Sequence, residues 1–394
     1  MRGFRSYKSL LLRSWVGRKG FTAAPRLPHV ERFRPSLPQT DPVKFDRILI
    51  RATNWLGDAV MSLPAVQQIR TRFPQAHLVV LAHPRVAGLY RKLSSVDEVI
   101  PYSAPPHRRD WHARWKAVRE LRRHRFDAAI LLQNAFEAAA LVWLAGIPVR
   151  IGYDGERRGI LLSHAVAMPK PGEIPVHQRY YYVELLRRAG LIQTLPDIPT
   201  IRLPGISALR EAGEKRLNGA RQHAPDQLWI GVAPGVANGK AKQWIPERLA
   251  ETAAIAAKDM EAQVAVFGLA SERDLCERVA GLIRRKRVSA ESFADQTSFE
   301  EFLEMAAACA IFLANDSGAM HLASALDVPT VAVFGPSDPL ATGPAGRHWA
   351  IVREPADCSP CLLHECPIDH RCMTAVTAGR AASALLELVQ LARK

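Results

Sequence analysis

Residues 47–64 read RILIRATNWLGDAVMSLP. Within this stretch the apolar residues change from a strand-like run to helical spacing, and this change indicates the fold. The first five residues form a short run with branched apolar side chains, which is typical of a buried strand. Gly57 lies in the turn that follows, and apolar residues then recur at helical spacing from Ala59 to Phe73, with Pro64 in the first turns. The stretch therefore predicts one strand–turn–helix unit.

The same unit recurs on both sides of residue 200. In the first half we expect strands at 47–51, 77–82, 98–101, 126–132 and 149–152, and helices at 59–73, 84–93, 112–124, 136–145 and 180–190. In the second half we expect strands at 228–232, 264–267, 311–314 and 330–334, and helices at 246–260, 271–284, 299–309, 321–326 and 378–392. Alternating strands and helices predict an α/β fold with two Rossmann-like, doubly wound parallel-sheet domains. Ligands of such sheets bind beyond the carboxyl ends of the strands, here in a cleft between the domains.

The length of 394 residues also favours two domains. We expect a basic flexible extension at 1–43, an N-terminal domain at 44–204 and a C-terminal domain at 205–394. The extension contains five prolines and has no sustained periodicity apart from one short basic helix around 6–18. Its apolar residues at 4, 7, 10–12 and 15 suit an anionic membrane surface, but a mis-assigned start or a disordered tail fits equally well.

The net charge of +15 indicates an anionic partner. Nine basic residues and one acid lie within residues 1–40, and further clusters lie at 108–125, 157–158 and 284–287. Nucleic acid, a phospholipid surface and an acidic substrate all fit this charge, as does a solvated surface without a partner. The longest apolar runs are far shorter than the ~20 residues of a membrane-spanning helix. Six cysteines without a secretion signal favour a reducing, cytoplasmic location.

Three segments that follow predicted strands carry residues suited to chemistry. Asp58, after the first strand, is either the N-cap of the next helix or a general base. The loop from Ala233 to Trp244 contains two glycines and two lysines (Gly235, Gly239, Lys240 and Lys242), which suits phosphate oxygens without matching a standard nucleotide motif. The third segment, 314–321, places Asp316, Ser317 and Gly318 at a helix start, with His321 one turn further on.

The order of these motifs resembles a known family. Asn54-Trp-Leu-Gly-Asp58 with Ser62 and Pro64, Pro234-Gly with Lys242 and Trp244, Phe267-Gly268, Asn315-Asp-Ser-Gly318 with His321, and Val333-Phe-Gly-Pro336 follow one another in register. Together they resemble the heptosyltransferases of lipopolysaccharide inner-core synthesis, which are family 9 glycosyltransferases with the GT-B fold. The resemblance runs from about residue 46 to the C-terminus, and the first motif is more similar to heptosyltransferase II than to heptosyltransferase I.

The resemblance implies inverting, metal-independent transfer of heptose from ADP-heptose to the heptosyl-Kdo-lipid A inner core, with no cofactor required. By similarity, Asp58 is the general base, and Lys242 neutralises the charge that develops on the leaving diphosphate. The donor site implied by the resemblance and the phosphate loop comprises Gly235, Asn238, Glu272, Asp316, Ser317, Gly318 and His321. Glu272 is the expected contact of the adenosine ribose. The family's hydroxyl residues in the phosphate loop are replaced here by Ala237 and Asn238, so backbone groups are expected to make those contacts.

The acceptor implied by the resemblance is anionic and membrane-bound. Six arginines of the N-terminal half are candidates for binding it: Arg51, Arg85, Arg108, Arg109, Arg157 and Arg158. The expected location is accordingly the cytoplasmic face of the inner membrane, with the protein bound peripherally and without nucleic acid.

Four cysteines are grouped near the end of the sequence, at Cys358, Cys361, Cys366 and Cys372. Four thiolates at such spacing can hold a structural zinc ion or an iron–sulfur cluster. Disulfide pairing and a reduced loop without metal are alternatives, because the two wider gaps do not match a standard zinc ribbon. No catalytic role is expected for this group.

Other classes explain the sequence less well. A nucleic-acid-binding protein would need a recognisable binding module, and none is evident. An NAD-dependent dehydrogenase would need a glycine-rich fingerprint after the first strand, which is missing. A nucleotide-sugar epimerase, a family 9 enzyme with another donor or acceptor, and a non-catalytic relative remain alternatives.

Overall fold

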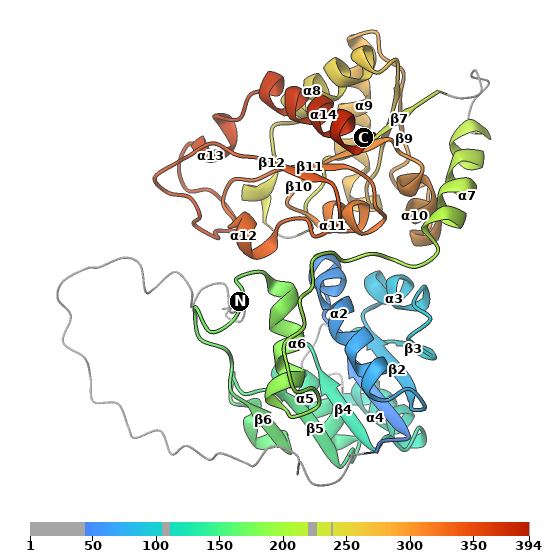
Figure 1. Cartoon of the computed structure of the whole chain (residues 1–394), viewed down its shortest axis with the longest axis vertical. Helices are drawn as coiled ribbons and strands as arrows, with labels where there is room; N and C mark the ends of the chain where they lie inside the picture. The colour runs from blue at the N-terminus through green and yellow to red at the C-terminus, as the bar shows by residue number, and fades with distance from the viewer. Residues whose placement is uncertain (1–43, 105–110, 220–226, 238, 394) are drawn as a thin grey trace, which may run out of the picture.

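The computed structural model describes residues 44–104, 111–219, 227–237 and 239–393, which form two α/β domains stacked one on the other (Figure 1). Each domain is built around a six-stranded sheet in which all the paired strands are parallel. The predicted fold class, two Rossmann-like domains of the GT-B type, is therefore confirmed. The extension at 1–43 lies outside the described residues.

The first sheet has the strand order β3-β2-β1-β4-β5-β6. Its strands are β1 (Arg47–Arg51), β2 (His77–Ala82), β3 (Glu98–Pro101), β4 (Ala128–Leu131), β5 (Val149–Tyr153) and β6 (His164–Val166). Ile50 of β1 pairs with Val80 of β2 on one side and with Ile130 of β4 on the other. These central strands are buried on both faces, which explains why they read as nearly continuous apolar runs.

The second sheet repeats this arrangement with the order β12-β11-β10-β7-β8-β9. Its strands are β7 (Trp229–Ala233), β8 (Gln263–Val266), β9 (Ala290–Ser292), β10 (Ile311–Asn315), β11 (Thr330–Val333) and β12 (Trp349–Val352). Ala233 of β7 and Ala314 of β10 are register partners, so the loops after these two strands begin side by side at the same edge of the sheet.

Helices cover both faces of each sheet. In the first domain they are α2 (Leu56–Arg72), α3 (Pro84–Arg91), α4 (Trp111–Arg123), α5 (Phe136–Leu144) and α6 (Gln178–Arg188), with the 3₁₀ turn η1 (Arg158–Leu161). In the second they are α7 (Ile206–Gly219), α8 (Pro246–Asp259), α9 (Arg273–Arg285), α10 (Phe299–Ala307), α11 (Gly318–Ala325), α12 (Pro339–Thr342), α13 (Arg371–Thr374) and α14 (Ala378–Ala392), with the 3₁₀ turns η2 (Lys240–Lys242) and η3 (Ala270–Glu272). Alternate strand residues serve the two layers: Ile48 and Ile50 pack in the same cluster as α2 and α6, whereas Leu49 packs in the cluster of α4 and α5.

The core under α2 continues into the second domain. One cluster of buried residues contains Ile50 and Val60 of the first domain together with Phe312 and Met320 of the second. In Figure 1 the amino-terminal end of α2 points up at α11 and α12. The two domains therefore meet through apolar packing on the side where the carboxyl ends of the strands lie.

Most predicted elements match the structure within a few residues, and the differences lie at sheet edges and helix starts. The edge strands β6, β9 and β12, the helix α7 and the four-residue helices α12 and α13 were not expected. The edge strands have only three or four residues, which is too short to show a periodic pattern. In α7 the buried residues are Gly213 and Leu217, so this helix lacks a strong apolar stripe.

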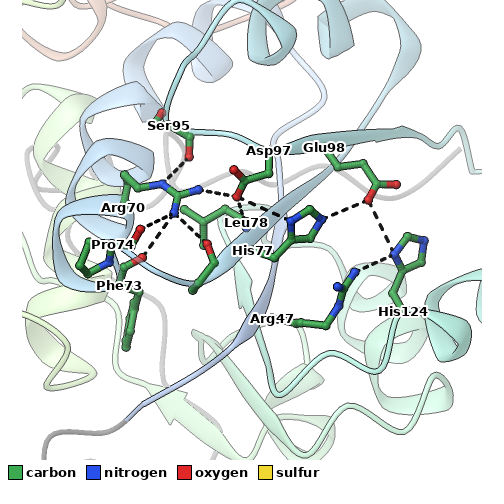
Figure 2. A network of polar contacts seen from close by, with 11 residues as sticks. Arg47, Arg70, Phe73, Pro74, His77, Leu78, Ser95, Asp97, Glu98 and His124 are labelled. Atoms are coloured by element: carbon green, nitrogen blue, oxygen red, sulfur yellow. Dashed lines mark hydrogen bonds and ion pairs between the residues drawn. The ribbon is translucent and has the colours of Figure 1, made fainter.

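Charged side chains form a network at the edge of the first sheet where β1, β2 and β3 begin (Figure 2). This edge lies opposite the one that faces the second domain. Arg70 donates to the carbonyl oxygens of Ser95 at 3.0 Å and Ala76 at 2.7 Å, and it pairs with Asp97 at 2.5 Å. Partial burial favours the neutral form of the Asp97 carboxyl, but the hydrogen bond from the Leu78 amide and the pairing with Arg70 outweigh it and lower the pKa of Asp97. The network is structural, because it lies at the amino ends of the strands, away from the cleft edge.

None of the helices in the described part of the chain is both long and apolar enough to cross a bilayer.

Candidate active site

The predicted phosphate loop follows β7 and is fastened to the neighbouring strand. The side chain of Asn315, at the end of β10, donates to the Pro234 carbonyl at 2.7 Å and accepts from the Trp244 amide at 3.1 Å. Gly239 adopts a φ of +89°, a left-handed value that favours glycine, and the chain then enters η2, which ends at Lys242. Asn315 therefore holds both ends of the loop against the sheet, a role that was not predicted for it.

Lys242 and Asp316 are brought together from the two adjacent loops. The Lys242 Nζ forms an ion pair with Asp316 Oδ2, and the Asp316 side chain is buried. The hydroxyl of Ser337 donates to the same carboxylate oxygen at 2.5 Å. Ser337 was not among the predicted site residues, although the Gly335–Asp338 turn follows β11 at the same edge of the sheet and was a signal for it.

Ser317 and Gly318 mark the amino-terminal end of α11. Ser317 is the N-cap, but its side chain makes no capping bond, and its buried Oγ has no hydrogen-bond partner among the described residues. A buried hydroxyl without a partner is costly in a folded protein. Together with the positive end of the helix, it provides a place where an anion oxygen fits.

Glu272 lies beside Gly235 at the start of the phosphate loop. A Cβ placed on Gly235 would stand 2.0 Å from Glu272 Oε1, so the Glu272 carboxylate would have to move away from any side chain at that position. The Leu269 amide donates to Glu272 Oε2 at 2.9 Å and holds the carboxylate there. The structure thus brings Glu272 to the same loop as Lys242. Asn238, also predicted for the donor site, lies outside the described residues.

Asp58 lies in the first turn of α2, on the other side of the domain interface. Trp55 is the N-cap of this helix and makes no side-chain capping bond, so the alternative interpretation of Asp58 as the N-cap is wrong. Tyr182 of α6 lies next to it: burial raises the pKa of the Tyr182 hydroxyl well above its usual value, and the negative charge of Asp58 raises it further. The half-buried Asp58 carboxylate thus lies at the third residue of the helix, within hydrogen-bond reach of the Tyr182 hydroxyl.

The amino-terminal ends of α2 and α11 face each other across the interface. The ring of His321 covers Gly57, whose Cβ, if present, would lie 2.8 Å from His321 Cδ2. In the reverse direction, a Cβ on Gly318 would lie 2.7 Å from the Cβ of Leu56. Asp58 directly follows Gly57, which contacts the donor-site helix α11. The predicted base on α2 and the predicted donor site on α11 are therefore brought together.

Of the candidate acceptor arginines that the structure describes, two are exposed and two are buried. Arg85 is exposed and lies over the ring of Trp55, with its Cζ 5.5 Å from the ring centroid, and Arg157 is exposed beside η1. Arg108 and Arg109 lie outside the described residues.

Arg51 and Arg158 require a correction, because both are buried and their guanidinium groups bind oxygens of their own domain, although the Nε of Arg51 has no partner among the described residues. Arg158 donates to the carbonyl oxygens of Tyr153 at 2.7 Å and Gln133 at 2.6 Å and to Asn134 Oδ1 at 2.5 Å. Arg51 donates to the Ala52 carbonyl at 2.8 Å and to Asn54 Oδ1 at 3.1 Å. Burial lowers the pKa of each guanidinium to about 10. These two arginines shape the loops after β1 and β4 and do not face an acceptor.

The four grouped cysteines are free thiols, of which Cys372 is buried and the other three are half-buried. Burial raises the pKa of Cys372, and the nearby thiols of Cys358, Cys361 and Cys366 raise it further. Within the described ranges, no three His, Cys, Asp or Glu side chains are arranged as a metal site.

The arrangement as a whole can bind a nucleotide diphosphate and deprotonate a second substrate. A lysine, a helix start and an unpartnered hydroxyl lie in the second domain, and a carboxylate faces them from the first. Two Rossmann-like domains that present these groups to each other define a GT-B glycosyltransferase.

Comparisons with known proteins agree with this class. The family model for glycosyltransferase family 9 (heptosyltransferase) matches residues 114–371. Lipopolysaccharide heptosyltransferase 2 of Escherichia coli K12 is 30% identical over 308 residues, which cover 78% of this chain and 88% of that protein. The chain belongs to glycosyltransferase family 9, the heptosyltransferase family.

Solved structures give the same result. The structure of the E. coli ADP-heptose lipopolysaccharide heptosyltransferase II superposes with a TM-score of 0.71 at 26% identity and covers 88% of this chain and 100% of that one. An E. coli heptosyltransferase solved with ADP superposes with a TM-score of 0.65 at 20% identity, over 86% of this chain and 98% of that one, and supports the fold.

Proposed function

We propose that this enzyme transfers heptose from ADP-heptose to the heptosyl-Kdo-lipid A inner core during lipopolysaccharide synthesis. The observation that carries the proposal is the cluster of Lys242, Asp316 and Ser317 at the start of α11, which faces the helix of Asp58 across the interface. The heptosyltransferase 2 of E. coli, whose sequence aligns over most of the chain, supports the choice of sugar and acceptor.

The proposed reaction is a single inverting displacement. The Asp58 carboxylate accepts the proton of the acceptor hydroxyl as its oxygen attacks the anomeric carbon of the heptose from the face opposite the leaving group. The bond between that carbon and the diphosphate oxygen breaks, and ADP leaves with the bonding electron pair. Lys242 and the start of α11 stabilise the developing negative charge, so that the reaction needs no divalent metal.

The donor would lie along the second domain. Its diphosphate would meet Lys242, Ser317 and the amide of Gly318, and its adenosine would extend along the phosphate loop towards Gly235 and Glu272. His321 would contact the heptose from one turn inside α11. The unpartnered Ser317 hydroxyl supports this placement, because a phosphate oxygen would satisfy it.

We also propose that the enzyme works at the cytoplasmic face of the inner membrane, where it binds peripherally to reach a lipid-linked acceptor. The outer surface of the first domain supports this proposal. Helix α4 exposes Lys116, Arg119, Arg122 and Arg123, and Trp115 of the same helix and Trp143 of α5 are 41% and 51% exposed. Cationic side chains beside exposed tryptophans suit an anionic lipid surface.

A structural metal at the grouped cysteines stays a prediction from their spacing. If zinc or an iron–sulfur cluster is bound, elemental analysis of the purified protein will find the metal at one equivalent or more, and a Cys361→Ser variant will lose it. No step of the proposed reaction depends on such a metal.

The proposal is tested by calorimetric titration with ADP, UDP and GDP in the presence of EDTA, followed by transfer assays with ADP-heptose. We expect selective binding of ADP and transfer that survives EDTA. A preference for UDP would move the donor to another sugar. Absence of nucleotide binding, or transfer that requires added metal, would contradict the proposal.

A further inference from the structure

The segment that carries the four cysteines packs behind the phosphate loop. This segment, residues 356–373, begins after β12, extends into α13 and is called the cysteine segment below (Figure 1). The Ala241 amide donates to the carbonyl oxygen of His364 at 2.9 Å, and His370 Nε2 donates to the Ala241 carbonyl at 2.6 Å. Both backbone polar groups of Ala241, the residue before Lys242, are therefore bound by the cysteine segment.

The contact with the loop is also steric. A Cβ on Gly239 would lie 3.1 Å from the Cα of His364, so a side chain at this position would crowd the segment. Ala241 is buried beneath these contacts, whereas Lys242 extends from the other side of the turn to Asp316. The turn η2 has only three residues, so these outside bonds, together with the anchoring of the loop ends by Asn315, hold the backbone of Lys242 in place.

The same segment holds the loop on the other side of Asp316. The Ser359 hydroxyl donates to the Gly335 carbonyl at 2.5 Å, and the Leu362 amide donates to the Pro336 carbonyl at 2.8 Å. The next residue, Ser337, donates to Asp316. The cysteine segment therefore supports two residues that bind Asp316, Lys242 through one loop and Ser337 through the other.

We infer that the cysteine segment positions the diphosphate-binding groups, and that His370 is the positioning residue that sets Lys242 for the donor. The inference rests on the proposed role of Lys242. A lysine on a loop that is already ordered loses less conformational entropy when a diphosphate binds, so the support raises donor affinity without touching the donor. The acceptor binds on the other domain, so its binding does not depend on this support.

Two histidines of the segment give a matched comparison. His370 contacts the loop with its side chain, whereas His364 uses its backbone carbonyl, which an alanine substitution retains. His370→Ala should weaken ADP binding roughly 3- to 10-fold, the effect of losing one hydrogen bond. His364→Ala should leave ADP affinity nearly unchanged. His370→Gln, whose amide can donate to the same carbonyl, should recover most of the loss.

The measurements are calorimetric titration with ADP and the KM for each substrate, on full-length protein. We expect the donor KM to rise in His370→Ala while the acceptor KM stays the same. Equal ADP affinities in wild type and His370→Ala would overturn the inference, and so would equal losses in His364→Ala. A wild type that binds no ADP would instead contradict the proposed function. If His370→Ala does not fold, Ser359→Ala tests the same support from the Gly335 side, with the same expected loss of ADP affinity.

Discussion

His321 of α11 lies against Gly57 of α2, so closely that a Cβ on Gly57 would stand 2.8 Å from the Cδ2 of the ring. This contact joins the two domains at the point where the proposed base and the proposed donor site meet. Because His321 is 4% exposed, its ring has little room to move aside.

Gly57→Ala should therefore impair catalysis without weakening its own helix. Alanine favours α2 by up to about 1 kcal/mol over glycine, but its methyl group would collide with His321 and push the two helix starts apart. We expect kcat/KM to fall roughly tenfold or more, as for a small misplacement of reacting groups. Gly281→Ala in α9, where a Cβ meets nothing within 4 Å, is the control. Full activity in Gly57→Ala would show that the interface opens freely.

Asp58→Asn should remove the proposed base and leave the nucleotide site intact. Asparagine has nearly the same shape but cannot accept a proton at neutral pH. We expect turnover to fall roughly 10²- to 10⁴-fold, with ADP affinity within about twofold of wild type. Steady-state kinetics and calorimetry measure the two effects separately. Unchanged turnover would remove Asp58 from the mechanism.

Lys242→Met should weaken both nucleotide binding and turnover, because it removes the ammonium group and retains the aliphatic stem. ADP affinity should fall about tenfold or more, as expected for loss of a charge-assisted contact. Lys240→Met is the matched control, since Lys240 lies in the same turn but is exposed. If both variants bind ADP like the wild type, the phosphate-loop assignment is wrong.

Arg157 and Arg158 should respond in opposite ways to substitution. Arg158→Met leaves three oxygen acceptors without their donor in a buried site, and we expect a loss of about 3 kcal/mol or more in the free energy of unfolding. Arg157→Ala should leave stability within about 0.5 kcal/mol and raise the KM of the acceptor. Denaturant unfolding and acceptor titration measure these effects. Equal stabilities of the two variants would contradict the assigned structural role of Arg158.

The burial of His177 at the domain interface should make the protein less stable in mild acid. Burial lowers the pKa of His177 to about 4, and the neutral ring donates from Nε2 to the Gly343 carbonyl at 3.0 Å across the interface. In the unfolded chain the imidazole titrates near pH 6.5. The stability due to the neutral ring is therefore fully present above pH 6.5 and is lost as the pH falls towards 4.

We expect this histidine to account for on the order of 1 kcal/mol of the decrease in unfolding free energy between pH 7 and pH 5. His177→Asn keeps a side chain that can cap α6 and cannot be protonated in this range, so its stability should vary less with pH. Urea unfolding at both pH values measures the difference. Parallel pH profiles of the two proteins would contradict this account.

The sequence predicts those parts of the fold whose residues are local and periodic. The strand 77–82 was predicted with its observed ends because a run of apolar residues is sufficient evidence for a buried parallel strand. The loops after β7 and β10 could be expected near each other, since consecutive units of a parallel sheet place their strand ends at one edge. Lys242, Asp316 and Ser317 were found in this way.

Contacts between distant residues could not be predicted in this way. Arg158 reads as a surface cation beside Arg157, and only the fold of η1 shows that it is buried beneath the loop after β4. The approach of His321 to Gly57 depends on how two domains pack, which no local pattern encodes. His370 and Ser359 were overlooked because the cysteines around them suggested a metal site instead.

The support of the phosphate loop by the cysteine segment also determines when the site can form as the chain is made. Lys242 and Asp316 are synthesised before residues 356–373, and at ~5–20 residues per second the delay between Lys242 and the end of the segment is about ten seconds. During that time the first domain and most of the second sheet can already fold. A chain that ends before residue 356 would thus contain every proposed catalytic and donor-binding residue and still lack a finished donor site.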